Sequence, residues 1–121
     1  MQTPTKILPL AIVILSGVVF GTVLKPDRVI SVTGLEHRGG TPGKSYRVDA
    51  KSWEGTSTAR EPTLYYQLAC GTGAADLAVG HIYEAMEGTT DGVKVLFIGL
   101  KVEDDVRVIM CEVESVKSTS K

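Results

Sequence analysis

The chain has 121 residues, a formal net charge of −1 and an apolar content of 43%. The apolar content argues against a disordered chain. The balance of thirteen basic against fourteen acidic residues argues against a nucleic-acid binder, which needs a concentrated basic face.

Residues 7–24 form an uncharged apolar run that would span roughly 27 Å as a helix, close to the thickness of a bilayer core. We predict that residues 1–25 form an N-terminal transmembrane or signal helix. An uncleaved single-span anchor is favoured because the run is long and lacks an Ala-x-Ala cleavage site. The alternative is a cleaved signal peptide, with cleavage near Gly17 or Gly21, which would release a secreted or periplasmic protein.

The flanking charges do not settle the orientation of this segment, because Lys6 precedes the run and Lys25 and Arg28 follow it. We expect the commoner arrangement, with the C-terminal domain exported. Gly17 and Gly21 form a G-x-x-x-G pair, a possible helix–helix contact that would make a homodimer. Glycines are also frequent in membrane helices generally.

After Pro26 the pattern changes to short apolar segments separated by Gly, Pro, Ser and Thr. Clean alternation is typical of half-buried strands, and Asp91-Gly92 is a hairpin signal. One short segment, 73–79, has a helical pattern. The predicted domain covers residues 26–117 and is followed by a flexible tail, 118–121; its six expected strands are 29–36, 45–53, 63–70, 81–87, 93–101 and 106–116.

These elements predict an all-β fold, a small antiparallel barrel of the oligonucleotide/oligosaccharide-binding (OB) type, with a β-sandwich as the alternative. The helical segment lies between the third and fourth strands, where an OB barrel carries its helix. The alternation also predicts a shared core, which comprises Tyr46, Val48, Leu64, Tyr66 and Leu68 together with Val95, Phe97, Val108 and Met110.

Two short motifs support an exported β-domain. Residues 66–70 read Y-x-L-x-C, and residues 77–83 read L-x-x-G-x-x-Y. This pattern, from Tyr65 to the end of the chain, resembles that of small bacterial exported or membrane-anchored β-domains. The resemblance implies export and a β fold, and it implies no particular activity.

The two cysteines, Cys70 and Cys111, both lie on expected strands. An even pair in a small exported domain predicts a disulfide, and two buried free thiols are the alternative for a cytoplasmic domain. Their spacing does not fit a C-x-x-C redox motif or a closed zinc site. We therefore predict no metal site.

No catalytic or cofactor-binding motif is recognisable, so we predict a non-enzymatic binding or structural module of the cell envelope, with an envelope protein as partner. The alternative is a small-ligand or cofactor-handling module on the same barrel. Trp53, Tyr65 and Tyr83 are candidate ligand contacts, because OB barrels often bind by aromatic stacking. Each of these aromatics could instead serve the fold.

Overall fold

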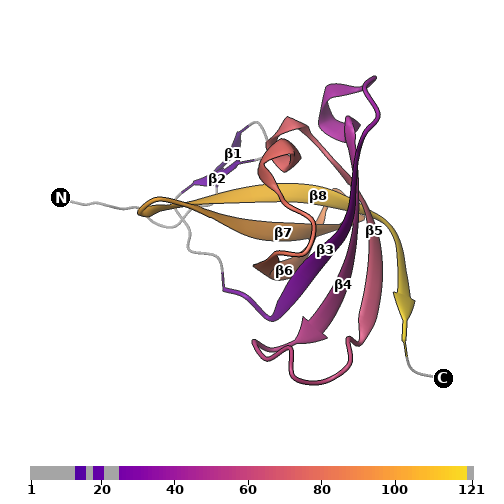
Figure 1. The fold of residues 1–121 in the computed structure, drawn as a ribbon. Helices are drawn as coiled ribbons and strands as arrows, with labels where there is room; N and C mark the ends of the chain where they lie inside the picture. The colour runs from indigo at the N-terminus through magenta and orange to yellow at the C-terminus, as the bar shows by residue number, and fades with distance from the viewer. Residues whose placement is uncertain (1–12, 16–17, 21–24, 120–121) are drawn as a thin grey trace.

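The computed structural model describes residues 13–15, 18–20 and 25–119, and residues 25–119 contain a closed six-stranded β-barrel (Figure 1). All neighbouring strands are antiparallel, and β6 returns to β3 to close the sheet. The predicted all-β barrel is confirmed, and the sandwich alternative is wrong because the sheet closes on itself. The strands in barrel order are β3 (Arg28–His37), β4 (Tyr46–Glu54), β5 (Leu64–Cys70), β8 (Asp105–Ser118), β7 (Val93–Val102) and β6 (Ile82–Thr90).

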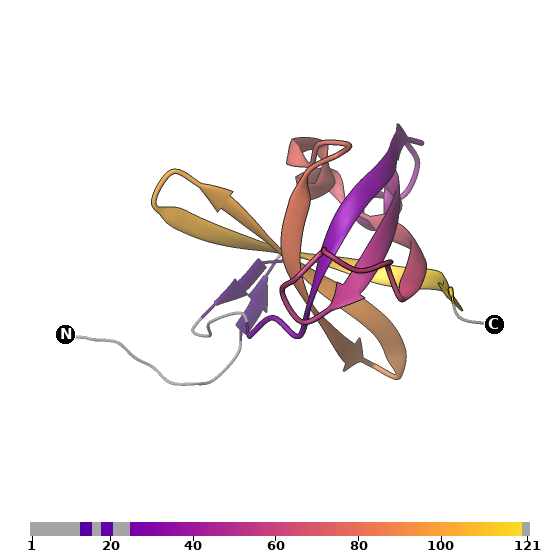
Figure 2. The same ribbon diagram turned by 60° about the horizontal axis from the view of Figure 1, so that its bottom comes forward.

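The barrel consists of two three-stranded meanders, β3-β4-β5 and β6-β7-β8, that meet at two seams. The β5–β8 seam pairs every residue of β5, whereas the β3–β6 seam pairs only the first four residues of β3. The two seams therefore differ in length. Figure 2 shows the β7–β8 hairpin extending beyond the barrel wall.

The expected strands agree with the observed ones to within a few residues at each end. The largest difference is in β6, which runs to Thr90 because its hairpin turn contains only Asp91 and Gly92. Both turn residues have positive φ, 53° and 79°, as a type I′ turn requires. The segment expected to be helical, residues 73–79, overlaps a short 3-10 helix, η2 (Thr72–Asp76). A second 3-10 helix, η1 (Pro42–Lys44), precedes β4.

The helix expected over residues 7–24 is not supported. The described part of that run forms two short antiparallel strands, β1 (Val13–Leu15) and β2 (Val18–Phe20), and β2 contacts β8. The β-branched residues in this run favour extended backbone, which is the physical reason for strands here. Among the described residues, no helix has the length and apolar composition needed to span a bilayer. Gly17 and Gly21 lie outside the described residues.

The predicted inner residues are confirmed for β4 and β5 in the first meander, and the prediction is corrected for β7 and β8 in the second. Val48, Tyr66 and Leu68 are buried in the core, and Tyr46 and Leu64 pack against it as predicted. The predicted inner residues of β7 and β8 lie outside the core cluster, on the opposite face of their strands, although Val95 and Val108 are themselves buried. The inner residues there are Leu96, Ile98, Leu100, Ile109 and Cys111.

The reason for this correction lies in the composition of β7. Both faces of residues 95–100 are apolar, so a period of two cannot tell the inner face from the outer one. The register couples the strands: Leu96 lies opposite Cys111, and Phe97 lies opposite Met110. An error of one residue in β7 therefore moves the predicted face of β8 as well.

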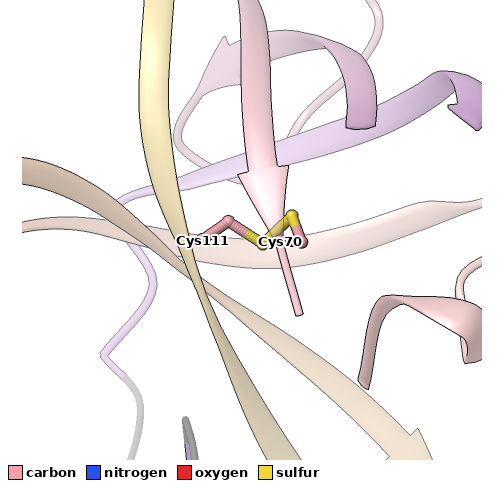
Figure 3. The surroundings of a disulfide bond; sticks show 2 residues. All are labelled: Cys70 and Cys111. Carbon is pink, nitrogen blue, oxygen red and sulfur yellow. A yellow bond between two sulfur atoms is a disulfide. The ribbon is translucent and has the colours of Figure 1, made fainter. Parts of the chain in front are cut away.

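The predicted disulfide between Cys70 and Cys111 is present (Figure 3). The two residues are directly opposed across the β5–β8 seam, with their Cα atoms 4.5 Å apart, and both are fully buried. The bond joins residues 41 positions apart in the sequence. In the chain-entropy model, closing a loop of this size contributes about 4 kcal/mol to stability.

The two ends of the barrel are closed to different degrees. At the end where β5 finishes, Ala74 of η2 and Leu77, which directly follows η2, are buried in the core. At the other end, at the bottom of Figure 1, β3 and β5 begin and β4 finishes. That end carries the pocket described below.

Replacing both Cys70 and Cys111 with alanine should lower the free energy of unfolding by about 2–4 kcal/mol, because the unfolded chain regains the entropy that the cross-link removes. Urea unfolding of the two proteins measures the difference. Wild-type protein denatured without reductant should resist thiol alkylation at both cysteines. Alkylation of both under those conditions would contradict the bond.

Candidate functional site

The open end of the barrel contains a pocket of about 340 Å³. Its wall combines the starts of β3 and β5, the ends of β4 and β8, and the middle of β6. Six of its seven lining residues are polar, so it differs from the mostly apolar pockets that hold typical small molecules. The lining residues are Arg28, Glu54, Thr63, Leu64, Glu87, Ser118 and Thr119.

Two of the lining residues, Arg28 and Glu87, are joined by Tyr66 in a hydrogen-bonded network. The Tyr66 hydroxyl donates to Glu87 Oε2 at 2.7 Å and accepts from an Arg28 Nη1 at 2.6 Å. Arg28 Nε also donates to Asp27 Oδ1 at 2.9 Å, and Arg28 Nη1 lies 3.7 Å from Glu87 Oε2. The network therefore joins β3, β5 and β6 across the end of the barrel.

Alternation along the strands positions these groups. Arg28 shares its face of β3 with Ile30 and Val32, which are both in the core. Tyr66 lies between Leu64 and Leu68 on the inner face of β5, with 1% of its surface exposed. The alternation that places apolar side chains in the core therefore also points the Arg28 guanidinium and the Tyr66 phenol inward, at the end of the barrel that carries the pocket.

The network changes the acidity of two of its members. Burial is the largest cause that raises the pKa of Tyr66 well above its ordinary value, and the hydrogen bond to Glu87 raises it further. For Arg28, burial alone would lower the pKa. The hydrogen bond to Asp27 and the nearby Tyr66, Asp27 and Glu87 outweigh burial, so the pKa of Arg28 is raised. The phenol therefore stays protonated and the guanidinium stays charged at physiological pH.

The chain on both sides of the pocket is held by hydrogen bonds. The Thr119 N–H donates to the Thr63 carbonyl at 3.0 Å, and Thr119 Oγ1 donates to the Pro62 carbonyl at 2.6 Å. The Trp53 indole N–H donates to the Arg60 carbonyl at 2.7 Å, which fixes the loop between β4 and β5. These contacts pre-organise the mouth of the pocket.

The three aromatic residues that the sequence suggested as ligand contacts are not gathered on one surface, and none lines the pocket. Trp53 is buried beneath the β4–β5 loop. Tyr65 is 48% exposed on the outer face of β5. The Tyr83 hydroxyl accepts a hydrogen bond from the Ala78 N–H at 2.9 Å, near the opposite end of the barrel. Whether any of them contacts a ligand stays a prediction.

The cysteines and histidines are also separated from the pocket. Cys70 and Cys111 are bonded to each other in the disulfide. His37, at the end of β3, packs against Tyr46 with the two rings tilted, and His81 is exposed before β6. Within residues 25–119 and the two short N-terminal strands, no three His, Cys, Asp or Glu side chains are grouped to hold a metal ion.

The sequence reasoning did not identify Arg28, Glu54 and Glu87 as site residues. A signal was present for all three: Arg28 has the parity of Ile30 on its strand, Glu54 has the parity of Ala50, and Glu87 has the parity of Ala85. A charged residue in register with a buried row indicates either a barrel end or a site. Glu54 is the exposed last residue of its row on β4.

Comparisons with protein-family models, with curated proteins and with solved structures found no match to this chain.

Replacing Tyr66 with phenylalanine should lower the free energy of unfolding by about 1–3 kcal/mol, because Arg28 and Glu87 lose the hydroxyl that bridges them. Urea unfolding near neutral pH measures this. The matched control is Tyr65→Phe on the outer face of the same strand, which should change stability by no more than about 0.5 kcal/mol. Equal effects of the two substitutions would contradict a structural role for the network.

The same pair of proteins should show a pH dependence. A phenol whose pKa is raised on folding contributes stability that is fully present below its unfolded pKa of about 10 and is lost as the pH rises toward its folded value. The stability gap between wild type and Tyr66→Phe should therefore narrow above about pH 10. A gap that stays constant up to about pH 11 would show that the phenol is not held in its neutral form.

Proposed function

We propose that this chain is a membrane-anchored or exported small β-domain that acts as a non-enzymatic binding module of the cell envelope. The observation that carries the proposal is the polar pocket at the open end of the barrel, whose walls are fixed by the Arg28–Tyr66–Glu87 network. An envelope protein is the proposed partner. A small ligand or cofactor bound by the same pocket is the second candidate, and the pocket volume of about 340 Å³ favours it.

The non-enzymatic reading is supported by the way the polar groups of the network satisfy one another. The raised pKa of Tyr66 makes its phenol a poor general base near neutral pH. Arg28 and Glu87 are both hydrogen-bonded to that phenol. Such groups are suited to recognition by fixed hydrogen bonds.

The membrane and export part of the proposal is supported by two independent features. The uncharged run at residues 7–24 has the length and composition of a single span. In the proposed orientation the C-terminal domain is exported. The Cys70–Cys111 disulfide is the kind of bond that persists in oxidising compartments. A periplasmic or secreted protein, released by signal cleavage, would share the second feature but lose the first.

The OB-like assignment of the barrel also belongs to this proposal. The η2 element lies between β5 and β6, which are the third and fourth strands of the barrel along the chain. The first barrel strand, β3, pairs with both β4 and β6. The barrel has six strands, one more than the five of an OB fold. This likeness of fold is an analogy and identifies no ligand.

Alkaline carbonate extraction of membranes separates the two proposed locations. An uncleaved anchor should keep the protein in the membrane pellet at its full mass, because an apolar span is not released by high pH. The control is the same chain without residues 1–24, which should be soluble after extraction. A soluble fragment from the full chain, beginning near Thr22, would show a cleaved signal peptide instead.

Filling the pocket tests the binding function. Thr63→Trp places a large side chain at the pocket wall, and Thr58→Trp places the same side chain on the exposed loop between β4 and β5. The proteins that co-purify with tagged wild type from native membranes should also be recovered with Thr58→Trp, and should be lost at least tenfold with Thr63→Trp, a difference of about 1.4 kcal/mol.

Thermal unfolding first establishes that both tryptophan variants are folded. Equal recovery of partners by the two folded variants would overturn the proposal that recognition occurs at this pocket.

A further inference from the structure

We infer that the pocket at the open end of the barrel binds a cation that carries several N–H donors, a guanidinium or a primary ammonium group. The inference rests on the proposed function, in that it names the chemistry recognised by the same pocket. Hydrogen-bond capacity, net charge and the polarity of the wall each lead to it.

The free hydrogen-bonding capacity of the pocket consists mainly of acceptors. Glu54 and Glu87 are carboxylates, which only accept when ionised. Each of the two threonine hydroxyls donates its single proton to a backbone carbonyl. Thr63 Oγ1 donates to the Ser52 carbonyl at 3.4 Å, and Thr119 Oγ1 donates to the Pro62 carbonyl at 2.6 Å. Their oxygens present lone pairs to an incoming group, so a ligand must bring the donors.

Among the described residues that line the pocket, the one cationic group does not offset this. Arg28 is engaged by Asp27, Tyr66 and Glu87, and only 12% of its side chain is exposed. Together, the pocket wall and Asp27 hold three carboxylates against this single guanidinium. The lining residues therefore keep a formal charge of −1, and the neighbouring Asp27 makes it −2. A negative charge attracts a cation and repels an anion.

A buried hydroxyl lies one row deeper than the pocket wall. Ser52 is 0% exposed, and its Oγ has no hydrogen-bond partner within the described part of the chain. In the barrel register, Ser52 pairs with Ile30 and with Leu64, the one apolar lining residue, whereas Arg28 pairs with Glu54 at the rim. An unused polar atom beneath a polar pocket is itself a feature that calls for a partner.

The residues that line the pocket favour a cationic head on a carbon stem. A planar guanidinium can form two parallel hydrogen bonds with one carboxylate, and an ammonium can direct its three protons to separate acceptors. Leu64 offers a methyl surface for the carbon stem. The same chemistry is found in a free polyamine and in the side chain of an arginine or lysine from a protein, and the experiment distinguishes these sources.

The test is an amide NMR titration of the full chain in non-ionic detergent at constant ionic strength. The probes are methylguanidinium, spermidine and an arginine-containing tetrapeptide, with sodium phosphate as the anion control. The cations should shift the amides of Thr63, Glu87 and Thr119, and phosphate should not. Stronger binding of spermidine would indicate a free polyamine, and stronger binding of the peptide would indicate a protein side chain.

The matched variants are Glu54→Gln and Glu36→Gln. Both remove one exposed carboxylate, the first at the pocket and the second at the far end of β3. Glu54→Gln should weaken cation binding about tenfold, the loss expected for one charge-assisted contact. Glu36→Gln should bind like wild type.

The inference is overturned if no cation shifts the pocket amides, if phosphate shifts them instead, or if the two variants bind equally well. Those results leave the proposed function standing when Thr63→Trp still loses its partners and Thr58→Trp does not. Cation binding by wild type combined with equal partner recovery by the two tryptophan variants would have the opposite meaning. It would support the ligand chemistry and reject the protein partner.

Discussion

The fold depends on joining two meanders at two seams, and the shorter seam is the critical constraint. The β3–β6 seam has four paired positions, whereas the β5–β8 seam has seven. A short seam in an open sheet would leave edges that pair with other chains or fray. The Arg28–Tyr66–Glu87 network reaches across this region from β3 and β5 to β6, so it adds contacts where the backbone ladder is short. The disulfide secures the other seam at its far end.

These two devices act through different physics. The disulfide acts mainly on the unfolded chain, by removing conformations, and depends little on what surrounds it once formed. The network acts on the folded state, and it is favourable only if each member keeps its partner. Buried charges without partners cost several kcal/mol, whereas charge-assisted hydrogen bonds contribute about 1.5–3 kcal/mol each. The barrel end is therefore sensitive to substitution of any of the three network residues, whereas the cross-link is lost only when Cys70 or Cys111 is replaced.

The sequence predicts strands and topology class far better than it predicts the inner face of every strand. Alternation in β4 and β5 identifies Val48, Tyr66 and Leu68 correctly, because one face of each strand is polar. In β7 both faces are apolar, so nothing in the local pattern separates Leu96 from Phe97. The pairing with β8 decides it, and that is a long-range property. The run at residues 7–24 shows the same limitation, since apolar β-branched residues suit a lipid-embedded helix and a packed strand alike.

The candidate site is less predictable than the fold, because its members come from five strands and become neighbours only when the barrel closes. That origin has an energetic consequence. A ligand held between β3, β4, β5, β6 and β8 contacts both meanders, and it finds its binding groups assembled only in the folded chain. Binding to the folded state alone adds RT ln(1 + [L]/Kd) to stability, about 2.7 kcal/mol at one hundred times Kd. Under the proposed function, occupancy of the pocket and closure of the short seam are therefore thermodynamically linked, because Arg28 and Glu87 belong both to the network and to the pocket wall.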